Sequence, residues 1–179
     1  MIMIMFDWRT LFDRAPHRTV RTGQALFRQG DRVRYMYLVR SGEVALERPM
    51  AEGTTLTLHL AVADMPVAEA SLFADAYHCD AVARTETVVA ATPRAAFVDA
   101  LRRHPDAALG LIRAHALEVQ AQRARIEILR LRRVADRLDA WQALNGAPGP
   151  REWVKVADEI GVTPAALYRE RARRKSRQV

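Results

Sequence analysis

The stretch PVAEASLFADAYHCDAVA, residues 66–83, brings together the side chains of this sequence that could bind a small ligand. A carboxylate such as Glu69 accepts hydrogen bonds from hydroxyl groups, and histidine or cysteine can bind heme iron. A cysteine beside a protonated histidine can also form a reactive thiolate. A phosphate pocket needs an arginine, and this stretch contains none. The candidate ligand-binding residues are Glu69, Ala70, His78, Cys79 and Asp80.

Other kinds of chemistry find little support in the sequence. Cys79 is the one cysteine, which excludes an intrachain disulfide and any multi-cysteine metal site within one chain. There is no Ser–His–Asp order, no pair of catalytic carboxylates and no Walker loop, so we expect no enzyme activity. The apolar runs are far shorter than the ~20 residues that span a membrane, and the start has no secretory leader. We therefore expect a cytoplasmic protein without a membrane partner.

The net charge of +7 is concentrated in the last third of the chain. Residues 1–110 carry 13 basic and 13 acidic side chains, whereas residues 111–141 carry 7 and 4, and residues 151–179 carry 8 and 4. A neutral body with a basic end indicates a polyanionic partner, typically nucleic acid. A solvated helix surface is the alternative explanation.

Residues 19–98 contain several short strand patterns. In YMYLVRSGEVALER, residues 35–48, Tyr35, Tyr37 and Val39 alternate with Met36, Leu38 and Arg40, as on the two faces of a strand. After a turn at Ser41-Gly42 the alternation resumes at Val44 and Leu46, which predicts a hairpin. TTLTLHLAVA alternates again, and DAVARTETVVAATPRAAF supplies two more strands. Short strands with a turn about every ten residues predict an antiparallel barrel or jelly roll.

The pattern changes to a helical period at Pro93. A short helix is predicted after Pro93, ending before Pro105, and one long helix over residues 106–146. Two apolar stripes at helical spacing run along it, which requires two packing partners: the body of the protein and a second copy of the helix. A bent helix that packs only on its own chain is the alternative. The predicted dimerisation residues are Ile112, Val119, Ile126 and Leu129.

NGAPGP, residues 145–150, is a linker rich in helix breakers, and a basic segment follows it. Helical spacing predicts one helix from about Trp153, a turn at Gly161, and a second helix capped by Thr163 with Pro164 first. Helix, glycine turn, helix is the helix-turn-helix pattern, and arginines fill the exposed side of the second helix. An ordinary helical hairpin is the alternative.

These segments together resemble the CRP/FNR family of bacterial transcription regulators. The resemblance rests on FRQGDRVRYMYLVRSGEVAL, on AEASLF, on TPRAAF entering a helix, and on the terminal ADEIGVTPAALYR. It implies an α+β fold: an N-terminal antiparallel β-roll or jelly roll related to cyclic-nucleotide-binding domains, a long dimerisation helix, and a C-terminal helix-turn-helix. The implied segments are residues 1–105, 106–146 and 150–179. The family usually continues into a β-hairpin wing, so we expect a truncated helix-turn-helix with an incomplete wing.

The resemblance also implies partners and site residues. The implied partners are double-stranded DNA, a second copy of the chain, and RNA polymerase. Arg169 best matches a base-reading arginine of the family, and Tyr168 and Arg173 match backbone contacts. Pro164 and Ala165 stand where well-known members carry an arginine and a glutamate, so their base code does not transfer. The implied DNA-binding residues are Thr163, Ala165, Tyr168, Arg169 and Arg173.

The resemblance gives the 66–83 stretch a specific meaning. Members that bind cyclic nucleotides carry a glutamate for the ribose and an arginine for the phosphate. Glu69 is kept, but the family's arginine–serine pair falls on His78-Cys79 or Cys79-Asp80. Neither placement supplies an arginine, so cyclic AMP binding in the usual way is not expected. A heme ligand, a reactive thiol, an unidentified small effector, or no effector remain open. We interpret the chain as a homodimeric CRP/FNR-type regulator, and the alternative is a ligand-sensing or scaffold dimer with a vestigial DNA-binding end.

Overall fold

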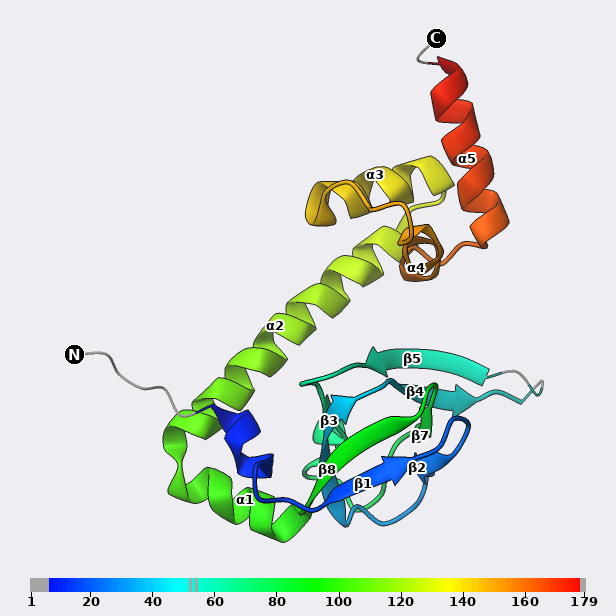
Figure 1. Ribbon diagram of the computed structural model, residues 1–179. Coiled ribbons are helices and arrows are strands. Elements are labelled where there is room, and N and C mark those ends of the chain that lie inside the picture. The colour runs from blue at the N-terminus through cyan, green and yellow to red at the C-terminus, as the bar shows by residue number, and fades with distance from the viewer. Residues whose placement is uncertain (1–6, 52, 54, 178–179) are drawn as a thin grey trace. The chain divides into compact units, whose positions relative to one another are not determined.

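A computed structural model describes residues 7–51, 53 and 55–177 of the chain (Figure 1). The residue contacts divide the chain into two compact units, Met1–Ile112, here called unit 1, and Arg113–Val179, here called unit 2. The described part of unit 1 contains the eight strands, and unit 2 is helical. The predicted α+β fold with an antiparallel β-roll is confirmed.

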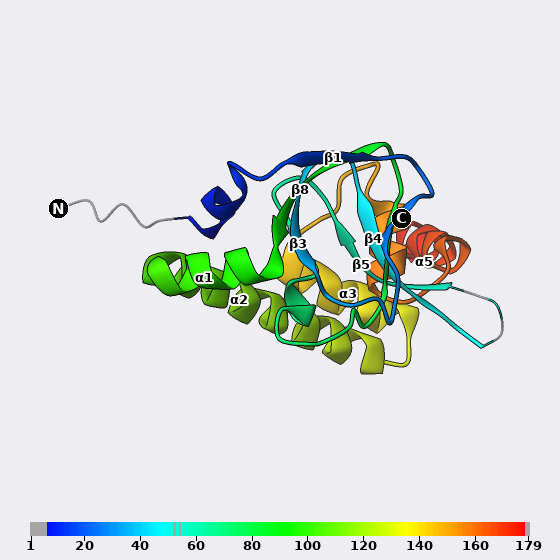
Figure 2. The same ribbon diagram turned by 90° about the horizontal axis from the view of Figure 1, so that it is seen from below.

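Unit 1 is built on two four-stranded antiparallel sheets, which face one another in Figure 2. The first sheet has the order β1 (His17–Val20), β8 (Thr87–Pro93), β3 (Tyr35–Ser41) and β6 (Pro66–Val67). The second has the order β2 (Ala25–Phe27), β7 (Asp80–Ala83), β4 (Val44–Pro49) and β5 (Thr55–Ala61). The chain therefore passes back and forth between the sheets, as in a jelly roll.

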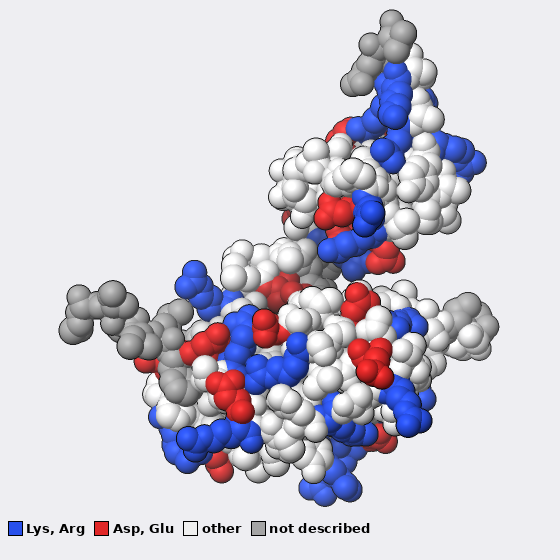
Figure 3. Space-filling view, in the orientation of Figure 1, with Lys and Arg blue, Asp and Glu red and all other residues white. Residues whose placement is uncertain are grey.

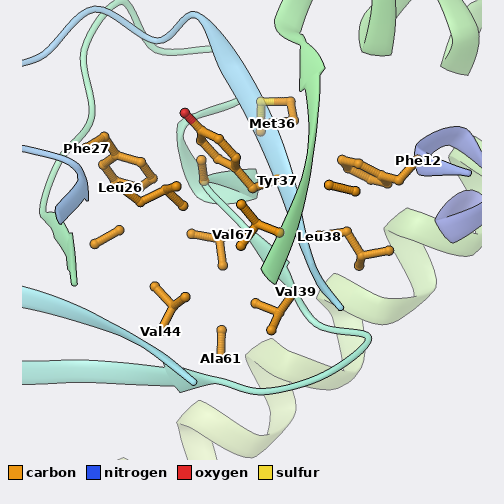
Figure 4. Packing of buried hydrophobic residues seen from close by; sticks show 14 of the residues in the cluster. Phe12, Leu26, Phe27, Met36, Tyr37, Leu38, Val39, Val44, Ala61 and Val67 are labelled. Atoms are coloured by element: carbon orange, nitrogen blue, oxygen red, sulfur yellow. The ribbon is translucent and has the colours of Figure 1, made fainter. Parts of the chain in front are cut away.

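Strand β3 is buried on both of its faces. Tyr37 and Val39 point into the space between the sheets, and Leu38 points toward the helices that cover the other side (Figure 4). Those helices are η1 (Trp8–Phe12) and α1 (Arg94–Arg103), whose Phe12 and Phe97 rings lie 5.2 Å apart. A buried side chain of this size contributes roughly 1.5–3 kcal/mol, so β3 anchors both layers of the core.

The predicted hairpin at Ser41-Gly42 is wrong. Gly42 makes a turn with φ +82°, but β3 pairs with β8 and β6, while β4 pairs with β7 and β5. The turn thus carries the chain from one sheet to the other. Alternation on both sides of a glycine predicts two strands and a turn correctly, but it does not say which strands become neighbours.

The predicted single helix over 106–146 is also wrong. Helix α2 (Pro105–Arg130) ends, and helix α3 (Val134–Asn145) begins after Arg133, whose backbone is extended with φ −98° and ψ 139°. The Arg137 guanidinium donates hydrogen bonds to the carbonyls of Leu131, at 2.7 Å, and Leu129, at 3.1 Å. These carbonyls at the end of α2 therefore accept from a side chain, which stabilises the break.

Two shorter helices complete unit 2: a short α4 (Trp153–Glu159) and α5 (Pro164–Arg177). An apolar cluster joins α2, α3, α4 and α5, with Ile128, Leu138, Trp141, Val156, Ala157, Ile160 and Leu167 buried. One of the two apolar stripes predicted for the long helix includes Ile128, Leu138 and Trp141. These residues pack inside the cluster of unit 2, so this stripe finds its packing partner within the same chain. Among the described residues, no helix has the length and apolar character needed to cross a membrane.

Replacing Gly42 tests the connection between the sheets. In Gly42→Ala the new Cβ would lie 2.5 Å from the carbonyl oxygen of Glu86 and 2.8 Å from Cα of Thr87, at a φ that disfavours side chains. We expect a loss of about 3 kcal/mol or more in the free energy of unfolding, measured by urea denaturation. Gly23→Ala is the control, because its φ is +78° and no atom lies within 4 Å, so it should lose only about 1 kcal/mol. Equal losses would contradict the close approach at Gly42.

Candidate functional site

The predicted ligand segment begins with a strained turn at the end of β6. Ala68 is buried and adopts a left-handed conformation with φ 80°, and the short 3-10 helix η2 (Glu69–Ser71) follows it. An alanine in this region costs roughly 1–2 kcal/mol relative to an unstrained backbone. The turn places Glu69 and Ala70 on η2, with Ala70 exposed.

One hydrogen bond joins η2 to the segment that precedes β7 (Asp80–Ala83). The Ser71 hydroxyl and His78 Nδ1 are 3.0 Å apart, although His78 is otherwise exposed. Cys79, next in sequence, is buried, and burial raises the pKa of its thiol. Neighbouring His78 and Cys79 therefore do not face one common ligand, and Cys79 has the environment of a small core residue instead of a reactive thiolate.

Asp80 is a structural carboxylate. It accepts a hydrogen bond from the Gln29 backbone N–H at 2.7 Å and forms an ion pair with Arg28 at 2.8 Å. Burial raises the pKa of this carboxyl, but the bonds from Gln29 and Arg28 outweigh burial, so the pKa is lowered overall. The carboxylate of Asp80 thus joins the start of β7 to the turn after β2.

A second buried acid lies opposite Asp80. Glu47 on β4 is the register partner of Asp80 on β7, and it forms an ion pair with Arg84. Both arginines that pair with these acids are exposed, and none of the described arginines of unit 1 is buried. The two buried acids of the described roll are already paired with Arg28 and Arg84, so these arginines are not left to neutralise a phosphate.

Aromatic side chains fill part of the space between the sheets. The ring of Phe27 stacks on that of Tyr77 with centroids 3.7 Å apart. The Tyr37 ring lies with its centroid 6.0 Å from that of Phe27, and Figure 4 shows these two rings side by side. The Tyr77 hydroxyl donates to the Tyr35 carbonyl at 2.8 Å, and burial raises the pKa of Tyr37. The contact between Phe27 on β2 and Tyr37 on β3 packs one sheet against the other, and this aromatic surface does not fit the charged phosphate of a cyclic nucleotide.

The predicted DNA-binding residues lie around the start of α5 and along it. The Thr163 hydroxyl accepts from the Ala166 N–H at 3.2 Å, which confirms the predicted cap, and α5 begins at Pro164 as predicted. Ala165, Tyr168 and Arg169 are exposed. Figure 3 shows Lys and Arg side chains gathered along the helix.

The arginines of α5 have different roles. Arg174 is committed to structure, because it bonds Asp139 at 2.6 Å and the Ala135 carbonyl at 2.9 Å. Arg171 lies 3.5 Å above the Trp153 ring, a cation–π contact. Arg173 pairs with the buried Glu170 at 2.6 Å. Arg169 makes no side-chain hydrogen bond or ion pair with the described residues, so its charge is available to a ligand.

The sequence reasoning missed the residues that complete each site. Arg28, Ser71 and Tyr77 determine the surroundings of the ligand segment, and Arg137 and Arg174 fix the helices of unit 2. Ser71 and Tyr77 lie inside the 66–83 stretch and were visible there, but their partners were not. Among the described residues, no three or more His, Cys, Asp or Glu side chains are grouped to hold a metal ion.

Comparison with known proteins finds a family model that matches the roll. Residues 17–104 match the cyclic nucleotide-binding domain family. No curated protein matches the chain in sequence. The fold is similar to that of FixK2 from Bradyrhizobium japonicum, with 17% identity and a TM-score of 0.66 over 92% of this chain and 86% of that one.

Two further structures support the likeness. The Thermus thermophilus catabolite activator protein has 22% identity and a TM-score of 0.52, over 95% of this chain and 83% of its own. The N-terminal domain of a transcriptional regulator from Streptomyces coelicolor A3(2) has 25% identity and a TM-score of 0.53, over 67% and 85%. The resemblance predicted from the sequence is confirmed for the domain family and the fold.

Asp80→Asn tests the structural role of the buried carboxylate. The folded-state pKa of Asp80 lies below its unfolded value, so its stabilising effect is present above the unfolded pKa of ~3.9 and is lost as pH falls through the folded pKa. The variant should be less stable than the wild type by about 1–2 kcal/mol at pH 7, and the difference should narrow below about pH 4.

Thermal and urea unfolding between pH 3 and pH 7 would measure this difference. Asp99→Asn is the control. This substitution removes the same charge, but the side chain of Asp99 is 62% exposed. A difference that stays constant over the whole pH range would contradict the assigned role of Asp80.

Proposed function

Because residues 17–104 match the cyclic nucleotide-binding domain family, we propose that this chain is a CRP/FNR-type transcription regulator that binds double-stranded DNA as a homodimer. The observation that carries the proposal is α5: its inner side is held by the apolar cluster of unit 2, and its outer side presents arginine. The fold likeness to the catabolite activator protein and to FixK2 supports it.

DNA binding is assigned to α4, the turn and α5, acting as a helix-turn-helix. Gly161 makes the turn with φ +64°, and Thr163 caps α5. In a helix-turn-helix the second helix enters the major groove with its N-terminal residues nearest to the bases. The exposed Ala165, Tyr168 and Arg169 lie in the first two turns of α5, so they are the residues assigned to the DNA.

Dimerisation is assigned to the apolar stripe of α2. Ile112, Val119, Ile126 and Leu129 have 61%, 47%, 51% and 38% of their surface exposed. The first three recur every seven residues, as in a coiled-coil seam. Burying these side chains against a second copy would remove them from water, and a two-fold dimer would present two α5 helices to a two-fold DNA site.

The roll is proposed to act without a cyclic nucleotide. Its buried charges are the acids Glu47 and Asp80, and the Phe27–Tyr77 stack occupies interior space. An effector, if the protein has one, would act by binding two dimer arrangements with different affinity. A heme, another small effector, and contact with RNA polymerase have no further support from the described residues. The alternative function, a scaffold dimer that does not bind DNA, is decided by the experiments below.

DNA binding is tested by fluorescence anisotropy with labelled duplexes over a range of salt concentrations. The wild type should bind at low salt, with log affinity falling by ~0.9 per log salt for each phosphate contacted. Adding cyclic AMP should leave the affinity unchanged. Arg169→Glu should weaken binding about tenfold or more, because it reverses a charge on α5. Arg103→Glu, a reversal on α1, is the control. Absence of wild-type binding at low salt would support the scaffold alternative.

Dimerisation is tested by analytical ultracentrifugation of two glutamate variants. Val119→Glu places a charge in the seam of α2 and should shift the protein from dimer to monomer. Leu117→Glu is the matched control, because Leu117 is 58% exposed but lies outside the heptad positions. A monomeric wild type, or equal behaviour of the two variants, would contradict the assigned seam.

A further inference from the structure

A groove of about 380 Å³ lies in unit 2 between the beginning of α3 and one face of α5. Its α3 side is formed by Arg133, Val134 and Ala135. Its α5 side is formed by Ala166, Arg169, Glu170 and Arg173, which are spaced i, i+3, i+4 and i+7 and therefore share one helix face. The small Ala166 leaves space between the longer side chains.

The charges that line the groove are mainly positive. The one acid among its lining residues, Glu170, is buried and already bonded to Arg173 at 2.6 Å and to Arg174 at 3.0 Å. Arg133 and Arg169 are exposed and have no hydrogen bond or ion pair from their side chains to any residue that the structure describes. Two uncompensated guanidinium groups thus face the groove from its two walls.

The two walls are fixed relative to one another. Arg174 on α5 bonds the Ala135 carbonyl and the Asp139 carboxylate on α3, and these contacts lie beside the groove. A binding site whose walls are already fixed does not have to be ordered when the ligand arrives. The exposed guanidinium groups of Arg133 and Arg169 make no hydrogen bond or ion pair with the described residues, so they are available to an anionic ligand.

We propose that this groove binds one phosphate of the DNA backbone, with Arg133 and Arg169 as its ligands. The proposal rests on the DNA-binding function assigned above and adds Arg133, which sequence reasoning did not identify. Guanidinium groups form charge-assisted, often bidentate hydrogen bonds with phosphate oxygens, and arginines on two opposite walls of one groove suit a single phosphodiester. Binding of the phosphate would also release counterions from the DNA, which favours association at low salt.

The assignment changes the role of Arg169. The resemblance to CRP/FNR regulators implies that this arginine reads a base, which would make its loss depend on the DNA sequence. Its position on the groove face of α5 makes it a backbone ligand, so its loss should weaken binding to every sequence equally.

The test is anisotropy titration of the full chain with two unrelated duplexes, over a series of salt concentrations. The variants are Arg133→Ala, Arg169→Ala, the double variant, and Arg103→Ala as the control in unit 1. Each single variant should weaken binding to both duplexes about tenfold, and the control less than about twofold. The double variant should lower the salt slope by ~0.9, the value for one phosphate. The side chain of Arg133 is exposed and makes no hydrogen bond or ion pair with the described residues, so the thermal melt of Arg133→Ala, followed by circular dichroism, should match that of the wild type.

The possible results distinguish failure of the groove assignment from failure of the DNA-binding proposal on which it rests. If the wild type binds neither duplex, the DNA-binding proposal fails and the groove assignment fails with it. If the wild type binds but Arg133→Ala behaves like Arg103→Ala, DNA binding stands and the groove assignment is overturned. A loss in Arg169→Ala on only one duplex, or a slope change of ~1.8 in the double variant, also overturns it, since these indicate a base contact or two separate phosphates.

Discussion

The guanidinium group of Arg137 is the interaction on which the arrangement of unit 2 depends. It donates to the Leu131 and Leu129 carbonyls at the end of α2. It also donates to the Ile160 carbonyl at 3.0 Å and the Gly161 carbonyl at 3.1 Å, in the turn before α5. Hydrogen bonds to a charged group contribute about 1.5–3 kcal/mol. One side chain therefore joins the end of α2 to the turn before α5, and together with the apolar cluster it holds the helices of unit 2 to one another.

Local features of the fold could be predicted because their causes lie close together in sequence. β7, β8, the helix after Pro93 and the start of α5 at Pro164 follow from alternation, proline geometry and a threonine cap. The break at 131–133 could not be predicted, because helical spacing continues through it and Ile160, one acceptor of the Arg137 guanidinium, is 23 residues away. The pairing of β3 with β8 likewise depends on segments about fifty residues apart.

The candidate site shows the same limit. The sequence of residues 66–83 shows directly that this segment contains no arginine. It could not show that Asp80 is held by Arg28, which is 52 residues away, or that Phe27 stacks on Tyr77. His78 and Cys79 are adjacent in sequence, yet one is exposed and the other buried, because the backbone turns between η2 and β7. Neighbours in sequence were therefore a poor guide to neighbours in the site.

The partition of charge between the units has a kinetic consequence. Residues 1–112 carry 13 basic and 13 acidic side chains, whereas residues 113–179 carry 15 and 8, so unit 2 holds the whole net charge of +7. Long-range attraction to a polyanion accelerates association, while close contacts set the lifetime of the complex. If the chain binds DNA as we propose, unit 2 would therefore steer the encounter, and the neutral unit 1 would contribute little to its rate.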